Sequence, residues 1–218
     1  MDNIRSQTRQ TLQALLEKRG GFLTHSDVIA AGLDAHVLTK AVKRGELERI
    51  QHGLYRPSEA GIYNQEEYFE IHLRVPSAVV CLRSALYLHG LTTTQPPELS
   101  FAINRQTRAP KIKFPPVRFY RFSGEAFEHG ITNLSVTRPG QPNGMNLPIY
   151  SPEKTLADLL KYRHKIGIDV FLEGLTLYFR RTGKHKPNPD ALQQAAQVCR
   201  VEKLMFTYTQ LLLVNTET

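Results

Sequence analysis

An α+β fold in two domains is predicted by three features of this 218-residue sequence. Apolar residues have helical spacing up to residue 45 and change to short extended runs between residues 47 and 56. An extended, proline-rich stretch lies between residues 99 and 150, and helical patterns return from residue 151. The turn-forming residues 57–61 mark the boundary, so the predicted domains are 1–60 and 61–218.

The first domain begins with two predicted helices. The first carries apolar residues at helical spacing from Leu12 onward, with residues 22–23 counted on the same face, and the pair Gly20-Gly21 ends it. The second begins at Thr24, because Asp27 three residues later completes a capping box, and it stops at Gly32.

A third helix, at about 34–44, and a hairpin, at about 47–56, complete this domain. Asp34 is expected to cap the helix and Gly45 to end it. Short extended runs on both sides of residues 51–53 predict the hairpin. The order helix, helix, turn, helix and hairpin is typical of a winged helix-turn-helix that binds double-stranded DNA.

The third helix is the predicted recognition helix. Its apolar face holds Val37, Leu38, Ala41 and Val42, which leaves the polar residues on the opposite face. Side chains near its start are expected to meet base edges, and those near its end to hold phosphates. The predicted DNA-binding residues of the helix are His36, Thr39, Lys40, Lys43 and Arg44.

The hairpin adds a predicted wing with the cations Arg49, His52 and Arg56. The alternative for the helix alone is a solvated basic face, and the adjacent cationic wing favours DNA binding. Charge by itself is a weak argument for this domain. The chain has a formal net charge of +8, of which residues 1–60 carry only +2.

The second domain is predicted to contain a small sheet and a C-terminal helical cluster. Strands are expected at 99–103, 117–122, 134–136 and 148–150, and helices at 64–76, 81–91, 152–164, 169–181, 189–198 and 201–213. Serine or asparagine followed by proline, at 151–152 and 188–189, marks two helix starts. Lys154 is expected on a basic outer face with residues 161–165, and Arg83 to form a buried salt bridge with Asp158.

A second basic surface is predicted where cations alternate with aromatic residues between positions 105 and 122. The aromatic residues are Phe114, Phe119, Tyr120 and Phe122, and no acid interrupts the run. Three interpretations stay open: a nucleic-acid surface, a strand pair with aromatics inward and cations outward, and a docking site for an acidic protein. The cations are Arg105, Arg108, Lys111, Lys113, Arg118 and Arg121.

No catalytic, metal-binding or cofactor-binding motif is found. The histidines lack the spacing of zinc sites, and the glycines lack that of phosphate-binding loops. We therefore expect no enzyme activity, no metal and no cofactor; a nucleic-acid enzyme with an unrecognised site is the third-ranked alternative. No apolar run is long enough to span a membrane. Cys81 and Cys199 lie among apolar neighbours, which predicts buried free thiols and a cytoplasmic protein.

Four segments of the chain resemble the AbiEi antitoxin family, and they follow in the same order. They are GGFLT at 20–24, KRGELERI at 43–50 with GLY at 53–55, SALYLHGL at 84–91 and SPEKTLADLL at 151–160. The resemblance implies a regulator linked to phage defence that represses its own operon. It also implies a type IV toxin–antitoxin role, with a nucleotidyltransferase-like toxin that need not bind the antitoxin directly. The alternative is an interaction module that docks a partner through its basic-aromatic segment without specific DNA binding.

Overall fold

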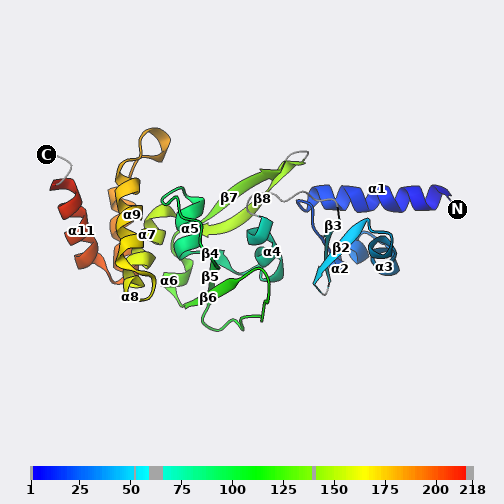
Figure 1. Cartoon of the computed structure of the whole chain (residues 1–218), viewed down its shortest axis with the longest axis horizontal. Coiled ribbons are helices and arrows are strands. Elements are labelled where there is room, and N and C mark those ends of the chain that lie inside the picture. Colours follow the sequence, from blue (N-terminus) through cyan, green and yellow to red (C-terminus); the bar gives the residue numbers. More distant parts are fainter. Residues whose placement is uncertain (1, 52, 59–65, 139–140, 215–218) are drawn as a thin grey trace. The chain divides into compact units, whose positions relative to one another are not determined.

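A computed structural model describes residues 2–51, 53–58, 66–138 and 141–214 of the chain. It is a mixed α+β structure that contains helices and two sheets (Figure 1). The Cα positions group into two compact units. The first contains Met1–Glu66 and Ser135–Asn146, and the second contains Glu67–Leu134 and Leu147–Thr218.

The first unit combines three helices with a three-stranded antiparallel sheet. The helices are α1 (Asp2–Lys18), α2 (His25–Ala30) and α3 (His36–Lys43), and the strands are β1 (Leu23–Thr24), β2 (Leu47–Gln51) and β3 (Leu54–Pro57). The sheet order is β1-β3-β2. Leu12, Leu16, Val28, Leu38 and Leu47 pack together as its core. These elements confirm the predicted helices and hairpin in this part of the chain.

The prediction that residues 22–23 share the apolar face of the first helix was wrong. Leu23 lies in β1 and pairs with Tyr55 of β3, although it is fully buried as expected. Gly20 and Gly21 adopt positive φ angles of 66° and 86°, a conformation that strongly favours glycine, and they turn the chain out of α1. The apolar spacing correctly indicated burial but not the change of secondary structure.

A mixed sheet in the order β6-β5-β4-β8-β7 belongs to the second unit, except for the parts of β7 and β8 within Ser135–Asn146, which group with the first. Its strands are β4 (Val79–Val80), β5 (Leu99–Asn104), β6 (Val117–Phe122), β7 (Ile131–Arg138) and β8 (Gln141–Tyr150). β4 pairs antiparallel with β5 and parallel with β8, and β5 pairs parallel with β6. The crossover between the parallel strands β5 and β6 is the loop of residues 105–116.

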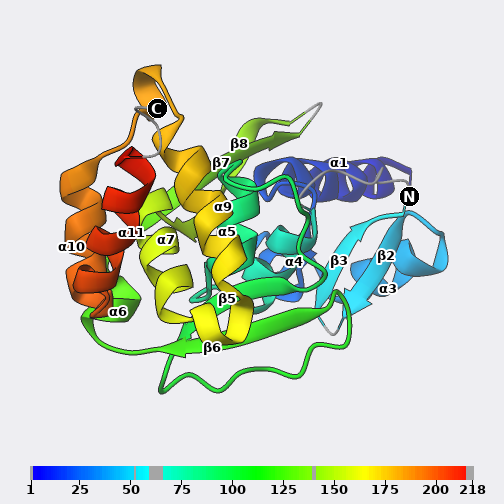
Figure 2. The same ribbon diagram turned by 60° about the vertical axis from the view of Figure 1, so that its left-hand side comes forward.

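The helices of this unit pack mainly around α7. They are α4 (Glu66–Arg74), α5 (Leu82–Leu88), α6 (Glu125–Glu128), α7 (Pro152–Lys161), α8 (Arg163–Ile166), α9 (Ile168–Phe179), the 3-10 helix η1 (Gly183–His185), α10 (Pro189–Cys199) and α11 (Glu202–Val214). α7 packs against α5, α9, α10 and α11, and Figure 2 shows α7, α9, α10 and α11 gathered together. Ser151 and Asn188 cap α7 and α10 as predicted, each followed by proline.

Three predictions for the second unit were wrong. The expected helix at 81–91 begins where predicted, with Cys81 as the N-cap of α5, but it ends at Leu88, and Gly90 follows with a positive φ of 65°. Val79–Val80 form a central strand that was not predicted. Lys154 is fully buried and does not belong to a basic outer face. Arg83 donates to the carbonyl oxygen of Ile166 at 2.5 Å, and Asp158 pairs instead with Lys154. The predicted helix start at Asn64 lies outside the described residues.

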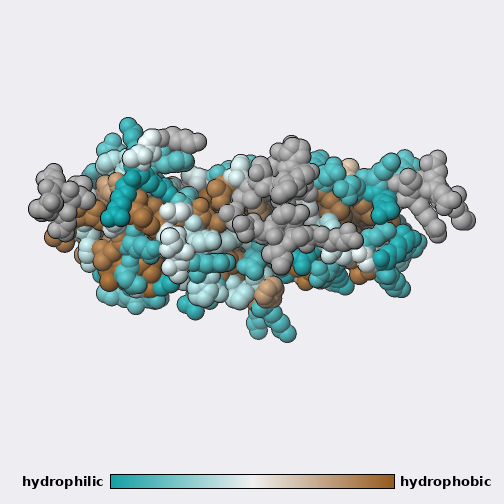
Figure 3. Space-filling model, turned by 45° about the horizontal axis from the view of Figure 1, so that its top comes forward, coloured by the Kyte–Doolittle hydropathy of each residue, from teal (hydrophilic) through white to brown (hydrophobic). Residues whose placement is uncertain are grey.

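Both cysteines are free and buried, as predicted. No helix among the described residues is both long enough and apolar enough to cross a membrane. On the face shown in Figure 3, hydrophilic residues alternate with smaller hydrophobic areas.

Candidate nucleic-acid interface

A capping box fixes the start of α2 and therefore the path of the chain into α3. The Asp27 amide donates to Thr24 Oγ1 at 3.1 Å, and the Thr24 amide donates to Asp27 Oδ2 at 3.0 Å. The guanidinium of Arg19 at the end of α1 pairs with the same carboxylate at 2.6 Å. Gly32, with φ +76°, ends α2 and begins the short turn before α3. Both oxygens of the Asp27 carboxylate are thus used in contacts that stabilise the fold.

α3 is amphipathic, and its apolar face is the one that the sequence predicts. Leu38 and Ala41 are buried in the core of the first unit, with Val37 and Val42 packed beside them. The Asp34 carboxylate accepts the amide of His36 at 2.8 Å, one residue earlier than a standard cap position. The five predicted contact residues, namely His36, Thr39, Lys40, Lys43 and Arg44, are all exposed.

The cations of α3 are available for an external partner. No described residue forms an ion pair or a side-chain hydrogen bond with the side chains of Lys40, Lys43 or Arg44. Lys40 and Lys43 lie in the last turn of the helix, and Arg44 is its C-cap residue. A face of three cations that no described residue pairs with, at one helix end, is suited to phosphate oxygens and the acceptor atoms of guanine.

Unlike the cations of α3, Arg56 of the hairpin has ion-pair partners within the chain. Arg49 is exposed on β2 and faces Tyr55 across the hairpin. Arg56 binds Glu48 on the opposite strand at 3.1 Å and lies 3.6 Å from the carboxylate of Glu66. Replacing Arg56 would therefore remove folding contacts as well as a cation. His52, the third predicted wing residue, lies outside the described residues.

The basic-aromatic segment lies in the second unit. All six of its cations are exposed, and four of them are in or beside the loop that joins β5 to β6. Arg118 pairs with Glu98 at 2.9 Å, and Arg121 donates to the carbonyl oxygens of Arg105 and Thr107. Phe122 is buried, whereas Phe114 is 67% exposed. The strand therefore buries one aromatic side chain and leaves Phe119 and Tyr120 half-buried, and the loop presents an aromatic side chain to solvent among cations.

Sequence reasoning missed two features of the second unit. One is the buried network of Lys154, Asp158 and Cys199, in which a Lys–Asp pair one helical turn apart neutralises itself inside the core. The other is a cavity lined by residues 123–126, by Lys161 and Arg163, and by residues 197–201, which no single stretch of sequence could indicate. Across the described ranges, no group of three or more His, Cys, Asp and Glu side chains is arranged to hold a metal ion.

Comparisons with known proteins agree with the architecture of both units. Residues 10–58 match the family model described as "Transcriptional regulator, AbiEi antitoxin", which confirms the resemblance for that segment. The crystal structure of the RV2827C protein from Mycobacterium tuberculosis is similar in fold, with a TM-score of 0.55 and 18% sequence identity. The similarity covers 95% of this chain and 81% of that one. No curated protein matches the sequence.

Proposed function

We propose that this chain, whose residues 10–58 match the AbiEi antitoxin family of transcriptional regulators, binds DNA sequence-specifically and represses its own operon. In this proposal the first unit is a winged helix-turn-helix. α2 and α3 form the helix-turn-helix, α3 enters the major groove, and the β2–β3 hairpin is the wing.

The exposed face of α3 is the observation that carries this proposal. Its buried side anchors the helix in the core, and its outer side carries three cations without intramolecular partners among the described residues. His36 and Thr39, near the start, would meet base edges. Lys40 would reach guanine or phosphate, and Lys43 and Arg44 would hold phosphates. On the wing, Arg49, His52 and Arg56 would contact the neighbouring backbone or minor groove.

Replacing Lys40 by alanine tests the proposal with little effect on folding, because the side chain is exposed and has no described partner. We expect about 5- to 100-fold weaker binding to duplex DNA from upstream of the gene, as is usual when one base contact is removed. Fluorescence anisotropy at one fixed salt concentration measures the loss of affinity. Lys18→Ala is the matched control, since Lys18 is an exposed cation of the same unit on α1. Equal affinities of wild type and Lys40→Ala would contradict the proposal.

The antitoxin role extends the proposal to a partner gene. A nucleotidyltransferase-like toxin would be neutralised without obligatory direct binding, and both proteins would act in the cytoplasm. Co-expression with a neighbouring nucleotidyltransferase gene tests this role through rescue of growth. The proposal assigns no catalytic step to this chain, and metal-dependent cleavage of DNA or RNA by the purified protein would overturn that part.

A second candidate function is supported by the exposed Phe114 among the cations of the 105–116 loop. An exposed aromatic side chain with a cationic rim is typical of protein-binding surfaces. In this alternative the loop docks an acidic protein and the first unit does not bind specific DNA. Co-purification with an acidic partner that Phe114→Ala abolishes, together with no measurable duplex binding, would favour it.

A further inference from the structure

A cavity of about 730 Å³ lies within the second unit, where the ends of several elements meet. Its walls come from residues 123–126 after β6, from the region where α7 passes into α8, and from the junction between α10 and α11. A volume of this size is typical of sites that hold a small molecule. The proposed DNA-binding role of α3 makes no use of it.

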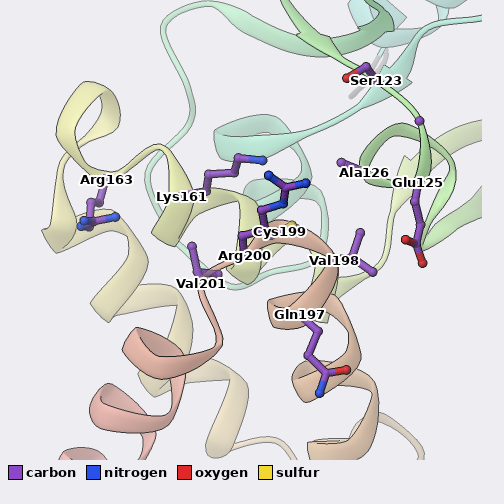
Figure 4. A pocket seen from close by; sticks show the side chains of 11 residues that line it. Ser123, Glu125, Ala126, Lys161, Arg163, Gln197, Val198, Cys199, Arg200 and Val201 are labelled. Atoms are coloured by element: carbon purple, nitrogen blue, oxygen red, sulfur yellow. The ribbon is translucent and has the colours of Figure 1, made fainter.

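Two exposed cations from different helices line this cavity. Figure 4 shows the ends of the Lys161 and Arg200 side chains directed toward one another, although they come from the end of α7 and the end of α10. Neither side chain has an ion-pair or hydrogen-bond partner among the described residues. Two positive charges therefore line one cavity, and Asp158, an acid whose charge interacts with Lys161, forms no ion pair or hydrogen bond with it.

The other charged groups of the lining do not cancel this positive charge. Arg163 also belongs to the lining, but its guanidinium donates to the carbonyl oxygen of Leu160 at 3.0 Å and is turned away from Lys161 and Arg200 in Figure 4. Glu125 is the one acid among the described lining residues, and Figure 4 shows its carboxylate turned away from Lys161 and Arg200. The cavity therefore carries a net positive charge.

The nearest buried carboxylate is already bound. Asp158 accepts from Lys154 Nζ at 2.5 Å and from Cys199 Sγ at 3.2 Å. Burial raises the pKa of the Cys199 thiol to about 12, so this thiol is a neutral donor to Asp158. The hydrogen bonds of Asp158 thus go to Lys154 and Cys199, and Lys161 interacts with its charge only at a distance. The donor groups of Lys161 and Arg200 are left for a ligand.

The backbone at Arg200 points to a role for its side chain. This residue has φ 60° and ψ 42°, the left-handed conformation that glycine adopts most easily at the end of a helix. Most other residues are disfavoured there by a close contact of Cβ. Glycine would end the helix equally well at this position. An arginine there adds a cation to the cavity lining instead.

We propose that this cavity binds the phosphate group of a small molecule, with Lys161 and Arg200 as its ligands. A phosphate dianion can accept from both cations at once, whereas a single carboxylate carries only one negative charge. The hydroxyl of Ser123 lies in the same lining and can donate to a further phosphate oxygen. Both free phosphates and phosphate esters present this group.

Isothermal titration calorimetry on the full chain in a phosphate-free buffer tests the proposal. The probes are inorganic phosphate, pyrophosphate, adenosine 5′-monophosphate and adenosine. We expect binding of at least one phosphate-bearing probe and none of adenosine, and the tightest probe distinguishes a free phosphate from a nucleotide. Failure of all three phosphate-bearing probes to bind would overturn the proposal, as would equally tight binding of citrate.

Two variants locate the site. Lys161→Gln and Arg200→Gly should each weaken binding of the tightest probe at least about tenfold, since each removes one charge-assisted hydrogen bond. Arg200→Gly should keep or raise the melting temperature, because glycine suits the left-handed backbone. Lys186→Gln, which changes an exposed cation outside the cavity lining, is the control.

Duplex DNA affinity separates this site from the proposed DNA-binding surface. Both cavity variants should bind the upstream duplex as the wild type does. Equal decreases for Lys186→Gln and the cavity variants, or a parallel decrease of DNA affinity, would show a diffuse surface charge and would refute a phosphate site. A failure of Lys40→Ala to alter DNA binding would leave the phosphate result unaffected.

Discussion

Lys154 and Asp158 form an ion pair inside the core of the second unit, one turn apart on α7. The two side chains are 0% and 2% exposed, and Lys154 Nζ lies 4.3 Å from the centre of the Tyr150 ring. Burial raises the pKa of Asp158, and the adjacent ammonium group of Lys154 opposes that shift. Each charge is tolerated in the core because the other is present.

Removing one member of this pair should therefore destabilise the protein strongly. Lys154→Met is expected to lower the free energy of unfolding by about 3–5 kcal/mol, because it leaves Asp158 buried without its cation. Adding Asp158→Asn to that variant should recover much of the stability. Urea unfolding of both variants measures the difference. A double variant less stable than Lys154→Met would refute the explanation.

His89 makes stability depend on pH near neutrality. Its Nε2 lies 2.6 Å from the carbonyl oxygen of Tyr150, and burial lowers its pKa. An unfolded histidine binds a proton near pH 6.5, whereas His89 stays neutral to lower pH in the folded protein. Protonation thus favours the unfolded chain, and stability is lost as the pH falls below about 6.5.

His89→Gln should remove part of this pH dependence while keeping a hydrogen-bond donor for Tyr150. A single such histidine contributes up to about 1.4 kcal/mol per pH unit below about pH 6.5, until its folded-state pKa is reached. Urea unfolding at pH 7.5 and pH 5.5 gives the change for each protein. If the variant and the wild type lose the same stability between these pH values, His89 is not the responsible group.

At the scale of elements, the capping box of α2 sets the position from which α3 starts. The Thr24 hydroxyl accepts the Asp27 amide and donates to the Asp27 carboxylate at 2.6 Å. Thr24→Ala should lower the free energy of unfolding by about 1 kcal/mol, the usual effect of removing such a cap. Thr24→Ser keeps the hydroxyl and should remain close to wild type in the same urea experiment. Equal destabilisation in both variants would assign the effect to the methyl group.

The elements that were predictable from the sequence carry local signals. α3 has a polar face opposite a four-residue apolar face, and α7 and α10 begin with a capping residue and a proline. β1 and β4 have two residues each, too few to show a period, and their pairing partners lie more than 20 residues away. Such strands are defined by tertiary contacts that no local pattern contains.

The candidate sites also differ in whether a local pattern indicates them. The exposed residues of α3 lie on one face of a single amphipathic helix, so the spacing of apolar residues predicted them. Sequence reasoning predicts an exposed Lys154 because a lysine is rarely buried without a partner, and it pairs Asp158, one helical turn away, with Arg83 instead. Lys161 and Arg200 are 39 positions apart and converge only through the packing of α10 on α7. No sequence period connects them.

At the scale of the whole molecule, positive charge and predicted specificity lie in different parts of the chain. Residues 61–218 carry +6 of the formal net charge of +8. Much of that excess is exposed between residues 105 and 121, and part of it is in the 105–116 loop. Non-specific DNA affinity follows the number of phosphate contacts, and sequence preference follows base contacts. The two properties should therefore respond to different substitutions.

A variant with Arg105, Arg108, Lys111 and Lys113 all changed to glutamine tests this division. We expect it to bind specific and random duplexes more weakly by the same factor, because phosphate contacts carry no sequence information. The slope of log K against log salt concentration should become shallower by about 0.9 for each phosphate that the variant no longer neutralises. Lys40→Ala should instead reduce the ratio of specific to random affinity. Anisotropy titrations with both duplexes at several salt concentrations measure the specific affinity, the random affinity and the salt slope.

An unchanged slope in the four-site variant would confine DNA binding to the first unit, and would leave the loop cations and Phe114 to a protein partner.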